Sequence, residues 1–143
     1  MPDDASNASP ELPDGVELRE GTDGLTPARI ATLYRRAPLH RPTTRPEALR
    51  TMFANASLVL AAWQGEQLVG VARLLTDGVL HSYLCDLAVE PDVQRQGLGK
   101  ALVNEVLDRL GDTRLVLRDP DLSTGFYEHL GFRRVENAWM IEN

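Results

Sequence analysis

The stretch that decides the fold is residues 84–102, LCDLAVEPDVQRQGLGKAL. Its first six residues form a mostly apolar run with the length of a buried strand, and Pro91 ends that run. A loop with two glycines, Gly97 and Gly99, comes next, and apolar residues then recur at helical spacing. The stretch therefore predicts a strand, a glycine-rich loop and the N-terminus of an amphipathic helix.

The start of that helix is suited to an anion. The first N–H groups of a helix have no acceptor within it, and the helix dipole adds positive charge there. Gly97 and Gly99 allow the backbone to come close to phosphate oxygens, and Arg95 and Lys100 add charge at the rim. Lys100 is the single lysine of the chain. The sequence predicts a phosphate-binding loop over residues 94–100.

Two common nucleotide motifs do not fit this loop. A P-loop needs an earlier glycine and a Ser or Thr after its lysine, but Ala101 follows Lys100. A dinucleotide-binding loop needs a third glycine where Leu102 stands. The remaining pattern is Gln94-x-x-Gly97-x-Gly99.

This pattern resembles the pyrophosphate-binding signature of the GCN5-related N-acetyltransferase (GNAT) superfamily. Residues 126–132, FYEHLGF, are similar to the segment that closes the same fold. The resemblance spans about residues 16–141. Within it, residues 69–89 look like the small bacterial and plastid members related to glucosamine-phosphate and arylalkylamine acetyltransferases. It implies an α/β (α+β) fold, with a mixed, mostly antiparallel sheet of six to seven strands flanked by about four helices. It also implies acetyl-CoA as cofactor. No metal is expected, because the single Cys and the three scattered His offer no cluster at metal-ligand spacing.

Periodicity and turn signals give a compatible order of elements. Extended segments are expected at 16–19, 57–63, 67–75, 79–89, 114–118 and 132–141, and helices at 27–37, from 46 to about 54, 98–110 and 121–130. The strand–helix–strand order over 79–118 predicts one parallel crossover in an otherwise antiparallel sheet. We expect a flexible tail at 1–13 and one N-acetyltransferase domain over 14–143.

Composition limits the classes of function. The 143 residues carry a net charge of −6, which disfavours nucleic-acid and membrane binding, and they include one Cys and three scattered His. No apolar run could span a bilayer, and the polar, acidic first residues do not resemble a signal peptide, so we expect a cytoplasmic protein. Residues 29–50 hold six Arg and His40. They would suit an acidic acceptor, unless they are the solvated faces of two helices.

The resemblance assigns roles to residues in both signatures. The backbone of the loop would hold the pyrophosphate, and one edge of the preceding strand would pair with the pantetheine arm. The cofactor-binding set is Leu87, Ala88, Val89, Gln94, Arg95, Gln96, Gly97, Leu98, Gly99 and Lys100. Tyr127 would be the general acid for the leaving thiolate, with a core aromatic as the alternative.

Asp86 is the second catalytic candidate. A carboxylate in an apolar run is expected to be paired with a positive charge, to be protonated, or to have a function. The candidate functions here are binding of the amine and action as a base through water. His81 or water alone are the other candidate bases. The roles that the resemblance assigns require no covalent intermediate, and Cys85 has no predicted activating neighbour, so we expect it to be a small buried hydrophobic residue. Tyr83 and Trp63 could either wall the acceptor site or pack in the core.

One departure from the family pattern bears on function. Members often carry an Asn for the pantetheine arm where this chain has Asp119-Pro120-Asp121, and whether these acids replace that contact is open.

The favoured function is transfer of acetyl from acetyl-CoA to a small-molecule or peptide amine by direct attack in a ternary complex. The alternative is a non-catalytic CoA- or acyl-CoA-binding sensor or interaction module. The family also allows a homodimer through the final strand.

Overall fold

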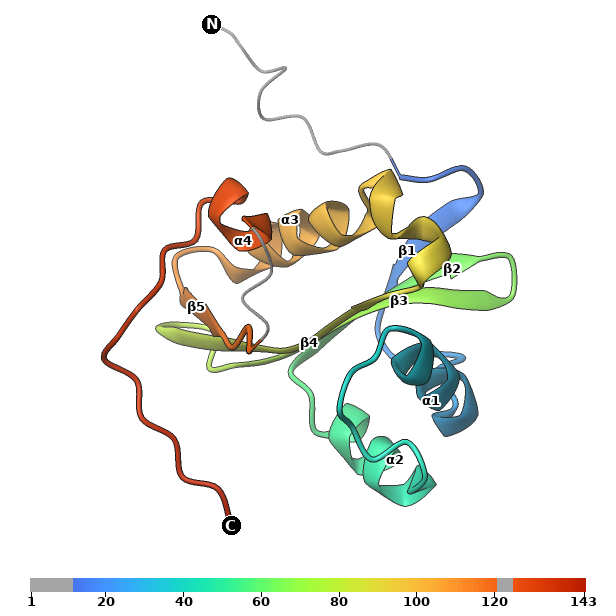
Figure 1. The fold of residues 1–143 in the computed structure, drawn as a ribbon, viewed down its shortest axis with the longest axis horizontal. Coiled ribbons are helices and arrows are strands. Elements are labelled where there is room, and N and C mark those ends of the chain that lie inside the picture. The colour runs from blue at the N-terminus through green and yellow to red at the C-terminus, as the bar shows by residue number, and fades with distance from the viewer. Residues whose placement is uncertain (1–11, 121–124) are drawn as a thin grey trace, which may run out of the picture.

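The computed structural model describes residues 12–120 and 125–143, which form a mixed sheet with helices on both faces (Figure 1). The sheet has the strand order β1-β2-β3-β4-β5. Its elements, in chain order, are β1 (Val16–Glu20), α1 (Pro27–Arg36), α2 (Pro46–Ala54), β2 (Leu58–Gln64), β3 (Gln67–Thr76), β4 (His81–Val89), the 3₁₀-helix η2 (Pro91–Gln96), α3 (Leu98–Leu110), β5 (Arg114–Leu117) and α4 (Phe126–His129).

The N-terminus of α1 shows how local sequence sets an element. The hydroxyl of Thr26 accepts a hydrogen bond from the N–H of Arg29 at 3.2 Å, and Pro27 occupies the first turn. Arg35 and Arg36 lie in the last turn, where positive charge favours the helix dipole. The predicted helix at 27–37 is therefore confirmed.

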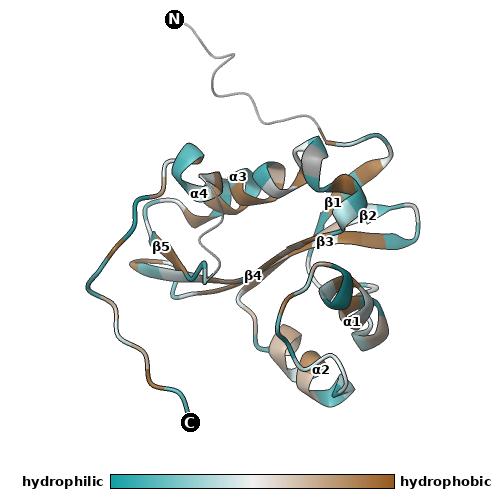
Figure 2. Ribbon diagram, viewed as in Figure 1, coloured by the Kyte–Doolittle hydropathy of each residue, from teal (hydrophilic) through white to brown (hydrophobic). Residues whose placement is uncertain are grey.

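The helices divide into two layers, with α1 and α2 on one face of the sheet and α3 and α4 on the other (Figure 1). Each layer buries its own apolar cluster, and the strands carry most of the apolar colour (Figure 2). The cluster under α3 includes Leu60, Ala72, Leu74, Leu84, Leu98, Leu102 and Val106. The cluster under α1 and α2 includes Ile30, Leu33, Tyr34, Leu49, Phe53, Val71 and Ala88.

A glycine in β3 sets how closely α3 approaches the sheet. A Cβ on Gly70 would lie 3.1 Å from side-chain carbons of both Leu98 and Leu102. Any larger residue would push the first turns of α3 away from the sheet. The close approach holds the start of α3 beside the end of β4.

The pairing of β4 differs along its length. It runs antiparallel to β3 throughout, but it pairs in parallel with β5 only from His81↔Arg114 to Leu84↔Leu117. The predicted parallel crossover is thus confirmed. The register with β3 shifts where Leu74 pairs with Leu84 and Arg73 pairs with Asp86, so Cys85 is an extra, bulged residue on β4.

Two boundaries differ from expectation. The predicted mixed α/β architecture is confirmed, but the sheet has five strands in the described part of the chain, and residues 132–141 are not a strand. A strand needs a hydrogen-bonded neighbour, and this segment has none in the sheet.

Residues 1–11 of the predicted tail lie outside the described residues. Leu12 packs against the core and Pro13 is buried, so packing begins before residue 14.

Candidate active site

The second half of β4 has one unpaired edge. After Leu84 the strand has no β5 partner, whereas Leu87, Ala88 and Val89 still pair with β3 on the other edge. Ala88 and Val89 have buried side chains, so toward the open edge they offer backbone groups. An extended ligand segment could form strand-like hydrogen bonds there.

The loop after β4 ends at a helix N-terminus with no side-chain cap. Gly97 is the N-cap of α3, with φ of 86°, and it has no side chain that could accept a hydrogen bond from the first N–H groups. The N–H groups of Leu98, Gly99 and Lys100 have no acceptor within the helix. The first turn contains no acidic residue. Outside Gly97, its two chain neighbours and the backbone of its own helix, no heavy atom of the described residues lies within 4 Å of the position where a Cβ on Gly97 would stand. This geometry can accept an anion.

The side chains of the loop mostly stabilise its shape. The amide of Gln94 donates to the carbonyl oxygen of Val89 at 2.9 Å, and that of Gln96 donates to the carbonyl oxygen of Asp92 at 3.1 Å. Leu98 is buried and Lys100 is exposed. Arg95 lies in η2, the one element of this region that the sequence did not predict. The backbone is therefore the main group that the loop presents to a ligand.

Gly99 has a packing role that the sequence did not reveal. A Cβ there would lie 3.3 Å from Cζ of Phe126 and 3.8 Å from Cγ2 of Val89. The absent side chain thus lets α4 lie against the start of α3. Gly99 was expected to admit a phosphate, and the structure adds that it positions the helix that carries Tyr127.

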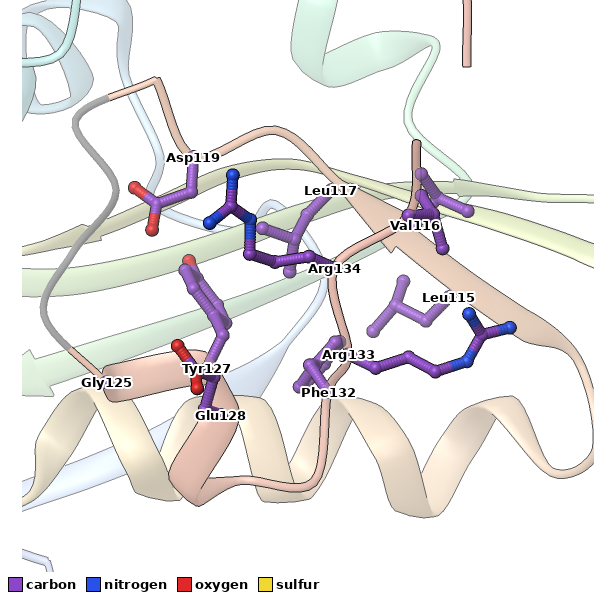
Figure 3. A pocket seen from close by; sticks show the side chains of 11 residues that line it. Leu115, Val116, Leu117, Asp119, Gly125, Tyr127, Glu128, Phe132, Arg133 and Arg134 are labelled. Carbon is purple, nitrogen blue, oxygen red and sulfur yellow. The ribbon is translucent and has the colours of Figure 1, made fainter. Parts of the chain in front are cut away.

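Tyr127 lies in a cavity next to the point where β4 and β5 separate. The cavity has a volume of about 600 Å³, and Leu117, which makes the last pair with β4, also lines it (Figure 3). The ring of Tyr127 packs edge-on against Phe126 and Phe132, with centroids 4.9 and 5.5 Å away. Burial raises the pKa of Tyr127 to about 12, and the negative charge of Asp119 adds to the increase. The phenol therefore holds its proton at neutral pH.

Asp86 is the centre of a buried network. Its Oδ2 accepts from Tyr34 Oη at 2.8 Å and from Arg73 Nε at 2.6 Å, and its Oδ1 accepts from Arg41 Nε at 2.6 Å. The side chain of Asp86 is fully buried. Arg41 also donates to the carbonyl oxygen of Cys85 at 2.9 Å. The network joins α1, the α1–α2 loop and β3 to the bulge in β4.

The network favours one of the alternatives that the sequence left open for Asp86. Burial alone would raise the pKa of this carboxyl, but the hydrogen bond and charge of Arg73, with help from Tyr34 and Arg41, hold it below its ordinary value. A carboxylate with a low pKa and both oxygens occupied is a poor base. The structure thus favours a paired carboxylate over a catalytic Asp86.

The other candidate bases and nucleophiles lie apart from the loop or are poorly activated. His81 is exposed and begins β4, so it stands at the end of the strand away from η2. Burial raises the pKa of the Cys85 thiol, which agrees with the expectation that it is no nucleophile.

Trp63 was a candidate for the wall of the acceptor site. It is buried in the core, under the guanidiniums of Arg19 and Arg29, and is therefore a packing residue.

Sequence reasoning missed the partners of Asp86. Arg73 gave a usable signal, because a charged residue inside an apolar strand needs an opposite charge. Tyr34 looked like part of an apolar helix stripe, and Arg41 like a loop residue.

The segment Asp119-Pro120-Asp121, which stands where family members often carry an Asn, is described only in part. Asp121 lies outside the described residues, whereas Asp119 lines the cavity of Tyr127.

The arginines of residues 29–50 are largely used within the fold. Arg36 donates to Glu90 at 2.5 Å and Arg35 to the carbonyl oxygen of Thr43 at 2.9 Å. The side chains of Arg29, Arg41 and Arg50 likewise donate to groups of this chain. This stretch therefore gives little support to an acidic acceptor.

Within residues 12–120 and 125–143, no helix has the length and apolar character needed to cross a membrane. Over the same residues, no group of three or more His, Cys, Asp or Glu side chains is placed to hold a metal ion.

Comparison with known proteins decides the family. The acetyltransferase (GNAT) domain model matches residues 31–141. The chain belongs to the GNAT acetyltransferase family. This domain is similar to the chloroplastic GCN5-related N-acetyltransferase 1 of Arabidopsis thaliana, with 28% identity over 82% of this chain and 61% of that protein. It is also similar to glucosamine 6-phosphate N-acetyltransferase of Trypanosoma brucei brucei, with 27% identity over 83% of this chain and 76% of that protein.

Solved structures agree with this assignment. A Deinococcus radiodurans protein assigned as an acetyltransferase superposes with a TM-score of 0.76 and 27% identity, and the match covers 92% of each chain. The chain spans 61% of the Arabidopsis protein and about half the length of other curated relatives that it matches.

Proposed function

We propose that this GNAT domain is an N-acetyltransferase that transfers acetyl from acetyl-CoA to a primary amine, by direct attack in a ternary complex. One observation carries the proposal: the open edge of β4 is followed, after the short 3₁₀-helix η2, by the N-terminus of α3, whose N-cap Gly97 makes no side-chain hydrogen bond. Coenzyme A has an extended pantetheine arm that carries amide groups, joined to a diphosphate. The open strand edge suits the arm, and the helix N-terminus suits the diphosphate.

The described residues fit coenzyme A through their backbone. The N–H groups from Leu98 to Lys100 would hold the diphosphate, and the open edge at residues 87–89 would pair with the pantetheine arm. Bound acetyl-CoA supplies the acetyl group, activated as a thioester. The apolar side chains of β4 keep this strand rigid, because they are packed into both cores.

Tyr127 is the proposed general acid. Its hydroxyl is protonated at neutral pH, because its pKa is about 12, and a phenol can give its proton to a departing thiolate. Its cavity borders Leu117, the residue at which β5 leaves β4. Tyr127 therefore lies beside the opening into which the thioester end of the arm would extend.

The amine must be neutral when it attacks, and solvent is the proposed acceptor of its proton. Asp86 is occupied by three donors, and His81 lies at the far end of β4. Neither group is arranged to take this proton. Water that enters with the acceptor can do so without a dedicated side chain.

Release of free thiol from acetyl-CoA, measured with a panel of amines, tests the proposal. The panel includes an amino sugar phosphate, because one relative acts by name on glucosamine 6-phosphate, and an arylalkylamine. Amine-dependent thiol release supports the proposal. Tight CoA binding without release on any amine would instead leave the non-catalytic CoA-binding module.

A further inference from the structure

A buried carboxylate lies between the two parts of the proposed cofactor site. Glu90 directly follows the open edge at residues 87–89, and it is the N-cap of η2, which leads to the start of α3. The residue is 2% exposed, and its side chain makes no capping hydrogen bond. A carboxylate taken out of water needs a partner, because an unpaired buried charge strongly destabilises a fold.

The partner of Glu90 comes from the other layer of helices. Arg36 lies in the last turn of α1, which covers the face of the sheet opposite to α3 (Figure 1). Its Nε donates to Oε1 of Glu90 at 2.5 Å, and its Nη2 contacts the same oxygen. Nη2 also lies 3.7 Å from Oδ2 of Asp92, in the first turn of η2. One guanidinium therefore holds two carboxylates at the start of the loop.

The backbone around this ion pair is also hydrogen-bonded. The N–H of Glu90 donates to the carbonyl oxygen of Val69 at 2.8 Å, and the carbonyl oxygen of Glu90 accepts from the N–H of Val93 at 2.9 Å. The ion pair therefore adds a side-chain anchor at the residue where β4 turns into the loop.

A neighbouring arginine shows that position as well as charge matters. Arg29 lies two turns before Arg36 on α1, and both line a cavity of about 310 Å³ that also reaches Glu90. The guanidinium of Arg29, however, donates to the carbonyl oxygen of Gly24 at 3.2 Å. The same cavity thus has one arginine that binds the loop and one that binds elsewhere.

The charge of the loop also depends on Arg36. Residues 90–100 contain two acids, Glu90 and Asp92, and two bases, Arg95 and Lys100, so their formal charges cancel. Arg36 adds one positive charge against the two acids. A surplus of positive charge favours a bound diphosphate, whereas an uncompensated carboxylate close to it opposes binding.

We propose that Arg36 is a positioning residue for the cofactor. Through its ion pair with Glu90 it holds the loop in the shape that binds the diphosphate, and it cancels the charge of that carboxylate. This role rests on the proposed function, because it requires that the N-terminus of α3 holds the diphosphate of CoA. The role concerns binding and not the chemical step, so loss of Arg36 should raise KM for acetyl-CoA and leave kcat unchanged.

Two acetyl donors test this role in the full chain. Acetyl-CoA carries the diphosphate, whereas S-acetylpantetheine has the thioester and the amides without any phosphate. Arg36→Gln should raise KM for acetyl-CoA and weaken CoA binding in calorimetry by about tenfold, the scale of one uncompensated charge near a binding site. Its kcat/KM with S-acetylpantetheine should stay at the wild-type value. The matched control Arg29→Gln removes the same charge from the same helix and cavity, and should change neither donor.

Two further variants test whether Glu90 transmits the effect. The double variant Arg36→Gln, Glu90→Gln removes the unpaired carboxylate and restores the charge surplus of the loop, so it should recover most of the CoA affinity. Glu90→Gln alone keeps an oxygen that can accept from Arg36, and it leaves no buried charge unpaired. It should therefore fold and bind CoA at least as tightly as the wild type.

The contrary results are distinct from one another. Arg36→Gln that binds CoA as tightly as the wild type contradicts the role, as does an equal loss of activity with S-acetylpantetheine. Weaker CoA binding by Glu90→Gln, or a folded double variant as weak as Arg36→Gln, removes Glu90 as the link. Circular dichroism checks the fold of each variant. A wild type that binds no CoA refutes the cofactor site itself, whereas calorimetry still tests Arg36 if CoA binds and no amine is acetylated.

Discussion

The guanidinium of Arg41 binds two groups of β4 at once: its Nε lies 2.6 Å from Oδ1 of Asp86, and its Nη2 lies 2.9 Å from the carbonyl oxygen of Cys85. Cys85 is the bulged residue, and β4 leaves β5 directly before it. Arg41 therefore fixes the strand at the point where its open edge begins. The buried ion pairs of Asp86 belong to the architecture of the site.

Replacing Asp86 with Asn should strongly destabilise the fold. The change leaves Arg73, whose side chain is 12% exposed, and Arg41 without a counter-charge. Removing one partner from a buried ion pair typically costs about 3 kcal/mol. Urea unfolding measures the loss. The control Glu47→Gln removes an exposed ion pair with Arg50 and should cost less than about 1 kcal/mol. Equal small losses in both variants would contradict the structural role of Asp86.

The contribution of Asp86 should depend on pH in one direction. Its pKa is lowered in the folded chain, so its stabilisation is complete above the unfolded value of about 3.9 and is lost as the pH falls through the lower folded value. The difference in unfolding free energy between wild type and Asp86→Asn should stay constant near neutral pH and shrink below about pH 4. Unfolding curves recorded at intervals of roughly half a pH unit measure this difference. If the difference already shrinks between pH 6 and 7, the low pKa of Asp86 in the folded chain is contradicted.

Tyr127→Phe should lower turnover at least tenfold, about 1.4 kcal/mol of transition-state stabilisation, with CoA affinity unchanged. The wild-type rate should not fall through this group until about pH 10 or above, because its pKa is about 12. Steady-state rates across pH measure both effects. The control is His129→Gln on the same helix, an exposed residue that should not alter the rate. An unchanged rate in Tyr127→Phe removes it as the acid.

Gly99→Ala should reduce stability and turnover together. Its Cβ would stand 3.3 Å from the Phe126 ring and push away α4, which carries Tyr127. Overpacking of this kind typically costs about 1–3 kcal/mol. Gly97→Ala is the comparison, because its site is open but its φ of 86° is strained for a side chain. It should weaken CoA binding while leaving Phe126 in place. Thermal unfolding and rates compare the two variants, and equal effects on turnover would argue against the packing role.

Local sequence predicted the parts of the fold that local chemistry controls. Thr26 with Pro27 marked the start of α1, and Gly97 marked the start of α3. The apolar run before Pro91 predicted β4, and its order with α3 and β5 predicted the parallel pair. These signals lie within a few residues of the element that they define.

Long-range pairs were outside the reach of local patterns. Asp86 receives hydrogen bonds from Tyr34, Arg41 and Arg73, which lie on three elements far apart in sequence. Periodicity could say that the carboxylate needed partners, but not which ones. The strand expected at 132–141 failed for a related reason, since an extended sequence becomes a strand only where a neighbour accepts its hydrogen bonds.

Isothermal titration calorimetry of the full chain with coenzyme A is the most direct measurement. The α3 N-terminus and the open edge of β4 predict saturable binding of one CoA per chain, weaker at high salt because the diphosphate carries charge, and weaker in Gly97→Ala. Absence of any heat of binding with millimolar coenzyme A would contradict the proposed site.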